Sequence, residues 1–290
     1  MVGREESGQR LDYFLSLKLN QLSRAGWQKQ IRDGFVAVDG QPAKASHRVG
    51  AGENITAAPA LARQSPELIK PAEPIPVIYE NDDIIVVDKP AGVIVHPSET
   101  STGPSVVADF VDLIDDDDDS RPGVVHRLDK DTSGVMLLAK NQAAKKYLIE
   151  QFKNRQIKKT YLALVWGHLK EPEATIELPI GRDGVKRTTM KVAGSGRTAI
   201  SHYQVESEYD KVSLVRINLE TGRTHQIRVH FAHLHHPVVG DKTYSKKPML
   251  PGLTRQFLHS GEISLTLPSG EAKSFISPLA PDLTQVLNKL

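Results

Sequence analysis

The residues best suited to chemistry lie in one polar segment, His126 to Gly134. The segment offers an imidazole, a guanidinium and a carboxylate at His126, Arg127 and Asp129. An ionised carboxylate can act as a nucleophile or as a base, and nearby polar groups can orient it. Most charges in such loops are solvated, so the plainer interpretation is that Asp129 pairs with Arg127 or Lys130 at the surface.

Apolar residues on both sides predict that this segment is a loop held by a strand. Val135 to Ala139 is a continuous apolar run with the length and composition of a buried strand, and Val124 and Val125 precede the loop. Gly123 and Gly134 bracket the turn and permit backbone angles that other residues avoid. The sequence therefore predicts polar groups on a loop that a rigid apolar segment anchors.

Three segments together resemble the motifs of the RluA/RluD family of pseudouridine synthases. The first, H-R-L-D-x-x-T-S-G, matches the family's catalytic motif at every fixed position. The second is K-K-T-Y-L-A-L-V, in a predicted strand from Gln156 to Val165. The third is T-G-R-T-H-Q-I-R-V-H, which extends through Pro237 to Gly240 and Asp241. The resemblance implies that Asp129 is the nucleophile, that Tyr161 lies against the target base, and that Arg228 pairs with Asp129. A guanidinium in that place would keep the carboxylate ionised and aimed.

The same resemblance implies RNA contacts around these groups. Arg127 stands where the family's arginine helps the target nucleotide leave its helix, and His126 and Arg223 are further candidates for RNA binding. The implied reaction cuts the bond between uracil and ribose, turns the base and rejoins it through carbon. It needs no net oxidation or hydrolysis, so no cofactor is expected, and extruding a base costs a few kcal/mol.

The first part of the chain, residues 8–60, reads as a compact module. Helical spacing of Leu11, Phe14, Leu15 and Leu19 predicts a helix from Arg10 to Asn20. A second helix is predicted after a cap at Ser23, with Trp27 and Ile31 on one face. Short strands near Phe35 to Val38 and Val49 to Thr56 complete the module with a small sheet.

The order of these elements resembles that of the S-four-type RNA-binding domain. The alternative is a helical adaptor module that binds no particular ligand. The resemblance implies that Arg24, Lys29 and Arg32 contact phosphates of the RNA. Such contacts give affinity but do not select a sequence.

A linker and a larger domain are expected to follow. Residues 61–74 are rich in Ala and Pro, which predicts an extended linker. Residues 75–290 predict an α+β catalytic domain: a mixed, mainly antiparallel sheet with flanking helices and a central RNA-binding cleft. Val77 to Pro90 reads as a structural hairpin, with His96 as a weaker candidate for the cleft. The five Asp residues from Asp115 to Asp119 predict a solvent-exposed loop.

Composition excludes several classes of protein and site. The chain has 290 residues and no Cys, which excludes disulfides, thiolate zinc sites and cysteine nucleophiles. A net charge of +2 does not by itself indicate nucleic acid, but Lys and Arg dominate residues 140–160. Five histidines lie between His225 and His236, yet their spacing lacks the H-E-x-x-H pattern, so no metal is expected. No apolar run approaches a membrane span, and a cytoplasmic protein is the default.

The sequence therefore favours an RNA pseudouridine synthase that modifies uridine in large-subunit ribosomal RNA. RNA is the expected partner, without membrane or cofactor, and the chain is expected to act as a monomer. Transfer RNA is the rival substrate, and a non-catalytic RNA-binding factor for ribosome assembly is the rival from another class. A metal-dependent hydrolase is a more distant alternative.

Overall fold

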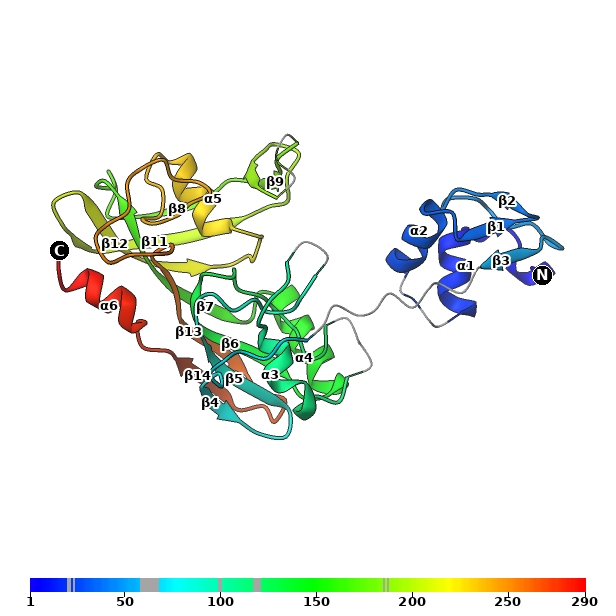
Figure 1. The fold of residues 1–290 in the computed structure, drawn as a ribbon, viewed down its shortest axis with the longest axis horizontal. Coiled ribbons are helices and arrows are strands. Elements are labelled where there is room, and N and C mark those ends of the chain that lie inside the picture. The colour runs from blue at the N-terminus through cyan, green and yellow to red at the C-terminus, as the bar shows by residue number, and fades with distance from the viewer. Residues whose placement is uncertain are drawn as a thin grey trace. The chain divides into compact units, whose positions relative to one another are not determined.

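A computed structural model of the chain describes residues 1–19, 22, 24–57, 68–98, 101–116, 121–184, 186 and 188–290, without the side chains of residues 25 and 29. The chain divides into two compact units, Met1–Ser65 and Pro66–Leu290 (Figure 1). The predicted linker, 61–74, is described only from residue 68 onward, and the predicted helix cap at Ser23 lies outside the described residues.

The first unit is built from short helices and a three-stranded sheet. Antiparallel pairing gives the sheet order β2-β1-β3. Leu11, Leu15, Trp27 and Ile31 are buried together, so the helical spacing of these residues predicted the correct faces. Its elements are the 3-10 helix η1 (Arg4–Glu6), α1 (Leu11–Lys18), α2 (Arg24–Arg32), β1 (Val36–Val38), β2 (Gln41–Pro42) and β3 (Ile55–Ala57).

The second unit contains one large sheet, a small hairpin and four α-helices among its described residues. No helix in the described ranges has the length and apolar character needed to cross a membrane. The helices are α3 (Val106–Phe110), continued by the 3-10 helix η2 (Val111–Leu113), α4 (Gln142–Lys153), α5 (Gln226–His233) and α6 (Pro281–Leu287). The strands are β4 (Val77–Glu80), β5 (Ile84–Lys89), β6 (Ser133–Ala139), β7 (Lys158–Trp166), β8 (Glu173–Glu177), β9 (Ile180–Arg182), β10 (Met190–Val192), β11 (Ile200–Glu208), β12 (Val212–Leu219), β13 (Leu258–Thr266) and β14 (Ala272–Ile276).

The large sheet has nine strands in the order β4-β5-β6-β13-β7-β12-β11-β8, with β14 paired to β13. Its pairs are antiparallel except for β13 beside β6, which run parallel. The predicted mixed, mainly antiparallel sheet is therefore confirmed. Strands β9 and β10 pair with each other as a separate hairpin.

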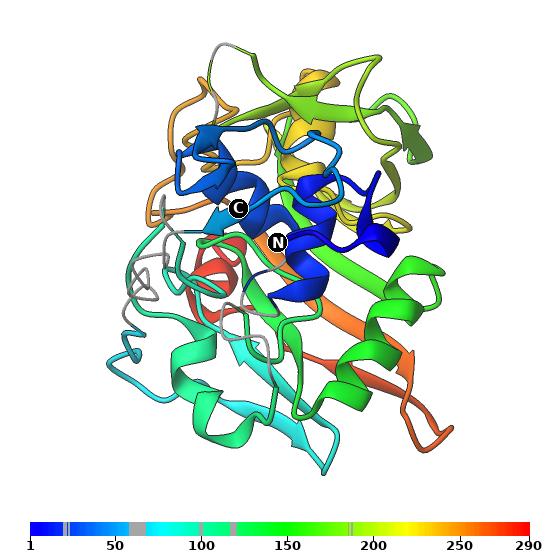
Figure 2. The same ribbon diagram turned by 90° about the vertical axis from the view of Figure 1, so that its right-hand side faces the viewer.

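Helices cover both faces of this sheet, because its central strands are apolar on both sides. Along β6, Met136 and Leu138 face a core that includes α3 and α5, whereas Leu137 faces the core of α4. A further cluster joins α6 to the α4 side of the neighbouring strands. Figure 2 shows α4, in green, beside the orange β13, where Gln151 Nε2 donates to Thr266 O at 2.7 Å.

The turn before β6 depends on Gly134. Its φ is +112°, and a Cβ built there would lie 2.2 Å from Ser260 O of β13. Any other residue would force the two parallel strands apart at the point where the polar loop joins the sheet. The predicted strand after the loop is confirmed, and it begins at Ser133.

The prediction of a solvent-exposed acidic loop is wrong for Asp116. Its side chain is 4% exposed, pairs with Lys145 of α4 and accepts a 2.8 Å hydrogen bond from Gly123 N. Asp116 therefore fixes the chain just ahead of the polar loop, a contact that like-charge repulsion within the run did not suggest. Asp117 to Asp119 lie outside the described residues.

Candidate active site

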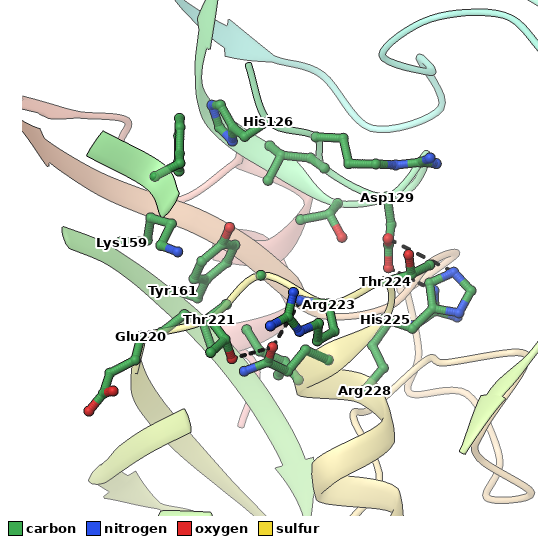
Figure 3. A pocket seen from close by; sticks show the side chains of 18 of the residues that line it. His126, Asp129, Lys159, Tyr161, Glu220, Thr221, Arg223, Thr224, His225 and Arg228 are labelled. Carbon is green, nitrogen blue, oxygen red and sulfur yellow. Dashed lines mark hydrogen bonds and ion pairs between the residues drawn. The ribbon is translucent and has the colours of Figure 1, made fainter. Parts of the chain in front are cut away.

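Six of the predicted site residues line one cavity of about 480 Å³ in the second unit. Figure 3 shows Asp129, His225 and Arg228 at one end of the cavity, Tyr161 and Lys159 at the other, and Arg223 between them. The remaining predicted residues belong to the first unit: Arg24 and Arg32 are exposed, and the side chain of Lys29 lies outside the description. The six that the cavity gathers are His126, Arg127, Asp129, Tyr161, Arg223 and Arg228.

Asp129 and Arg228 form an ion pair at the end of the cavity. Arg228 Nη1 donates to Asp129 Oδ2 at 2.9 Å, and the Asp129 side chain is 17% exposed. The alternative interpretation, in which Asp129 pairs with Arg127 or Lys130 at the surface, is therefore wrong. The guanidinium of Arg228 thus orients the carboxylate of Asp129, and one edge of the carboxylate still reaches the cavity.

A second carboxylate, Asp241, holds Arg228 from behind. Arg228 Nε and Nη2 donate to the two Asp241 oxygens at 2.7 and 2.9 Å, and Asp241 is 2% exposed. Asp241 Oδ1 also accepts from the backbone N–H groups of Thr243 and Tyr244. This bidentate pairing fixes the plane of the guanidinium, so that its remaining nitrogen points at Asp129.

The charges of this triad support one another. Burial lowers the pKa of Arg228, but the hydrogen bonds and charges of Asp241 and Asp129 outweigh burial and the pKa is raised. Burial raises the pKa of Asp241, and its hydrogen bonds with Arg228 outweigh that effect and lower it. Arg228 and Asp241 therefore stay charged at neutral pH.

Helix α5 places Arg228, and the segment before the helix is a closed turn. His225 adopts left-handed φ and ψ of 57° and 22°, and the helix begins at Gln226. Gln226 Oε1 accepts from Arg223 N at 2.9 Å and from Thr221 Oγ1 at 2.8 Å, which closes the loop on itself. The segment from Thr221 to Gln226 therefore forms a rigid turn that leads into the helix.

His225 lies beside both charged partners. Its Nδ1 is 2.7 Å from the Tyr244 hydroxyl, which accepts from Met190 N at 2.9 Å, and its Nε2 is 3.9 Å from Asp129 Oδ1. Burial lowers the pKa of His225, so the ring is neutral at pH 7. The hydroxyl is best satisfied by donating to Nδ1, which leaves Nε2–H directed at Asp129.

Tyr161 and His126 have different surroundings. Tyr161 is 7% exposed in the middle of β7, and burial raises its pKa to about 12, so it is a neutral phenol at the cavity wall. His126 Nε2 accepts from Leu137 N at 2.9 Å, and its ring is 5.0 Å from that of Phe152. Burial lowers the pKa of His126 to about 3. This neutral imidazole therefore anchors the loop to β6.

Two buried basic side chains, Lys89 and Arg255, hold the loop that carries Asp129. Lys89, fully buried at the end of β5, donates to Pro90 O, Val93 O and Lys130 O at 2.8, 2.7 and 3.0 Å. Arg255 donates to Asp131 O and Ser133 Oγ at 3.1 and 3.0 Å. The loop is thus fixed just after its nucleophile candidate, through the backbone of Lys130 and Asp131 and the side chain of Ser133.

Replacing Lys89 by Met is expected to destabilise the protein, because three carbonyl oxygens lose their buried donor. We expect a loss of about 3 kcal/mol, which corresponds to a fall in Tm of about 6–12 °C for a chain of this size. Thermal unfolding monitored by circular dichroism measures it, with exposed Lys246→Met as the matched control. An unchanged Tm would contradict this role.

The pH dependence of the same variant has a definite sign. Burial lowers the pKa of Lys89 from 10.5 to about 7. The unfolded chain therefore binds the proton more tightly, and the intact protein gains stability from this group as the pH rises from 7 towards 10.5. Lys89→Met lacks that gain, so its deficit should grow across this interval.

Sequence reasoning missed Asp241, Lys89, Arg255 and Tyr244 as parts of the site. Asp241 lay within the extension of the third motif, and Lys89 within the hairpin that was read as structural. Their contacts join segments far apart in the chain, so local pattern carried no signal of their partners. His96, the weaker candidate for the cleft, is buried and is not among the residues lining the cavity.

Known families and proteins resemble this chain over most of its length. Residues 83–233 match the family model for RNA pseudouridylate synthase, and residues 9–55 match that for the S4 domain. A Bacillus subtilis protein described as an uncharacterized RNA pseudouridine synthase, YlyB, is 36% identical, covering 100% of this chain and 96% of that protein. The ribosomal large subunit pseudouridine synthase D of Pseudomonas aeruginosa is 36% identical, covering 99% and 93%.

Solved structures also resemble this chain over most of its length. Human RNA pseudouridylate synthase domain containing 1 superposes with a TM-score of 0.58 at 29% identity, covering 74% of this chain and 89% of that one. The human domain containing 4 protein gives a TM-score of 0.60 at 24% identity, which shows a shared fold.

Proposed function

Because the chain belongs to the RNA pseudouridine synthase family, we propose that it isomerises uridine in large-subunit ribosomal RNA. Membership makes the protein an isomerase that acts on RNA. The ribosomal substrate is supported by two relatives named ribosomal large subunit pseudouridine synthase D, each 36% identical over at least 98% of this chain. We further propose that it works in the cytoplasm as a monomer.

One observation carries the assignment of the site: a carboxylate clamped by a buried guanidinium at a cavity whose wall holds a tyrosine. We propose that Asp129 attacks ribose C1′, or removes the 2′ proton in the glycal route, while the N1–C1′ bond breaks. The base then turns and C5 bonds to C1′, as the Asp129–C1′ bond breaks in the nucleophilic route, or as Asp129 returns the proton to C2′ in the glycal route. C5 loses its proton and N1 gains one, so the atoms balance without a cofactor.

The other side chains would bind and orient the nucleotide. Tyr161 offers its ring to the extruded uracil, since aromatic rings stack on bases of any sequence. Arg228 holds Asp129 in line, supported by Asp241. Arg127 is exposed at the cavity rim, where it can occupy the space that the base leaves in the RNA helix.

The S4 module would add affinity through phosphates. Arg32 is exposed on α2, and Arg24 lies 5.9 Å from the Tyr13 ring while its Nε donates to buried Asp12 at 3.2 Å. Arg24 is thus held in place with part of its guanidinium exposed. With Lys29 on the same helix, these cations would contact the RNA backbone, which gives binding without sequence choice.

The test is release of tritium from RNA whose uridines carry tritium at C5, because the isomerisation loses that atom. We expect release from large-subunit ribosomal RNA transcripts, none from transfer RNA, and equal release with a chelator present. Release from transfer RNA alone would overturn the ribosomal substrate. Binding without release from either RNA would favour an assembly factor, and sensitivity to chelator would favour a metal-dependent reaction.

A further inference from the structure

Lys159 is a cation in the cavity that the reaction described above leaves unused. It lies on β7 two residues before Tyr161, so the two side chains share one face of the strand. Figure 3 shows both beside the same hollow, with Arg223 across from them. Phe152 lies on one side of the amino group, 5.8 Å from Nζ to the ring centre.

The carboxylates of the cavity are engaged with other partners. Glu220 accepts from Arg155 Nη1 at 3.0 Å and lies 2.8 Å from His202 Nε2. Asp129 pairs with Arg228. Within the part of the chain that the structure describes, no carboxylate oxygen lies within 4.0 Å of Lys159 Nζ. Among the described residues, the cavity therefore presents this ammonium without a counter-ion.

Arg223 is held in position but keeps donors to spare. Its Nε donates to Thr198 O at 2.9 Å, and its backbone N donates to Gln226 Oε1 at 2.9 Å. Burial lowers the pKa of Arg223, and burial together with the charge of Arg223 lowers the pKa of Lys159 to about 8. Two cations that are half-buried and repel each other are stabilised by an anion placed between them.

We propose that Lys159 and Arg223 form a binding site for one phosphodiester of the RNA, the one next to the uridine whose base meets Tyr161. The inference rests on the proposed function and assigns a ligand group to part of the same cavity. Ammonium and guanidinium groups only donate hydrogen bonds, and phosphate oxygens only accept them. A phosphate adjoins every uridine in RNA, so the site fixes register without reading sequence.

The test is RNA binding as a function of salt, with matched variants of neighbouring lysines. Lys159→Met removes the charge inside the cavity, and Lys158→Met removes an exposed charge one residue earlier on the same strand. We expect Lys159→Met to weaken binding about 10–100-fold, as for a lost charged hydrogen bond, and to reduce the slope of log K against log salt by about 0.7–0.9. Arg223→Met should act similarly, and Lys159→Arg should restore most of the slope.

Steady-state tritium release separates binding from chemistry. Lys159→Met should raise KM with kcat within about threefold of the intact protein, because a phosphate held equally in ground and transition states changes binding alone. An unchanged salt slope, or an affinity loss no larger than that of Lys158→Met, would overturn the phosphate site. If Lys159→Met unfolds, Lys159→Gln is measured in its place.

The outcomes also separate this inference from the proposed function. The titrations use whichever RNA the intact protein isomerises, so failure on ribosomal RNA alone leaves the phosphate site under test. If the intact protein isomerises no RNA, the proposed function fails, and the titrations are made with the large-subunit ribosomal RNA transcripts, whose salt slopes still report on Lys159. If it is active and the slopes are unchanged, only the phosphate site fails.

Discussion

Asp129→Asn is expected to abolish tritium release, with a loss of at least about 10⁴-fold in kcat. The amide has nearly the size of the carboxylate, but it cannot act as a charged nucleophile or accept a proton from ribose. Both routes of the reaction need that capacity, so the loss should not depend on which route operates. Release is measured under single-turnover conditions, which isolates the chemical step from product release.

The fold should survive this substitution. Arg228 keeps both hydrogen bonds to Asp241, and Asp129 itself reaches the cavity with 17% of its side chain exposed. We therefore expect a Tm within a few degrees of the intact protein and retained RNA binding. Asp210→Asn, at a side chain 88% exposed, is the matched control and should keep full activity. If Asp129→Asn keeps more than 1% of the activity, Asp129 is not the nucleophile.

Arg228→Gln is expected to lose both activity and stability. It removes the three hydrogen bonds to Asp129 and Asp241, and it leaves Asp241 buried as an unpaired carboxylate. Breaking a buried pair in this way costs about 3–5 kcal/mol, and we expect activity to fall at least about 10³-fold because Asp129 loses its orienting partner. Arg216→Gln removes an exposed pair with Glu206 and should cost at most about 1 kcal/mol.

The stability deficit of Arg228→Gln should depend on pH. In the intact protein the lowered pKa of Asp241 contributes stability that is present above its unfolded value, near 4, and is lost as the pH falls. Without Arg228, burial raises the pKa of Asp241, and the carboxyl can take up a proton. The deficit in free energy of unfolding, from urea titrations, should therefore be smaller at pH 4 than at pH 7.

Arg228→Lys separates charge from geometry. A lysine keeps one positive charge, but its ammonium cannot match the bidentate contact to Asp241 while reaching Asp129. We expect it to recover part of the stability and little of the activity. Full activity in Arg228→Lys would mean that the charge alone suffices and that the guanidinium plane is unimportant.

Local patterns in the sequence determined much of the fold. The run from Val135 to Ala139 predicted a buried strand because every residue is apolar, and β6 is buried on both faces. The spacing of Trp27 and Ile31 likewise predicted the buried side of α2. These predictions succeeded because periodicity and turn residues act over a few positions, which the sequence displays directly.

The three motifs identified the family and predicted several of the residues that line the cavity. Resemblance named Asp129, Tyr161 and Arg228, and these line one cavity together with Arg127 and Arg223. Residue types alone did not determine which cation pairs with Asp129, because Arg127 and Lys130 lie in the same loop. Pairing with Arg228 spans 99 positions of sequence.

Only the tertiary structure decided what holds the site in place. The order of strands brings β13 parallel to β6 and sets Gly134 against Ser260. Packing then buries Asp241 behind Arg228 and fills the space under the loop with Lys89. Such contacts depend on which distant segments become neighbours, and a buried charge is tolerated only where that neighbourhood supplies its partners. A one-dimensional pattern shows the charges but not the partners.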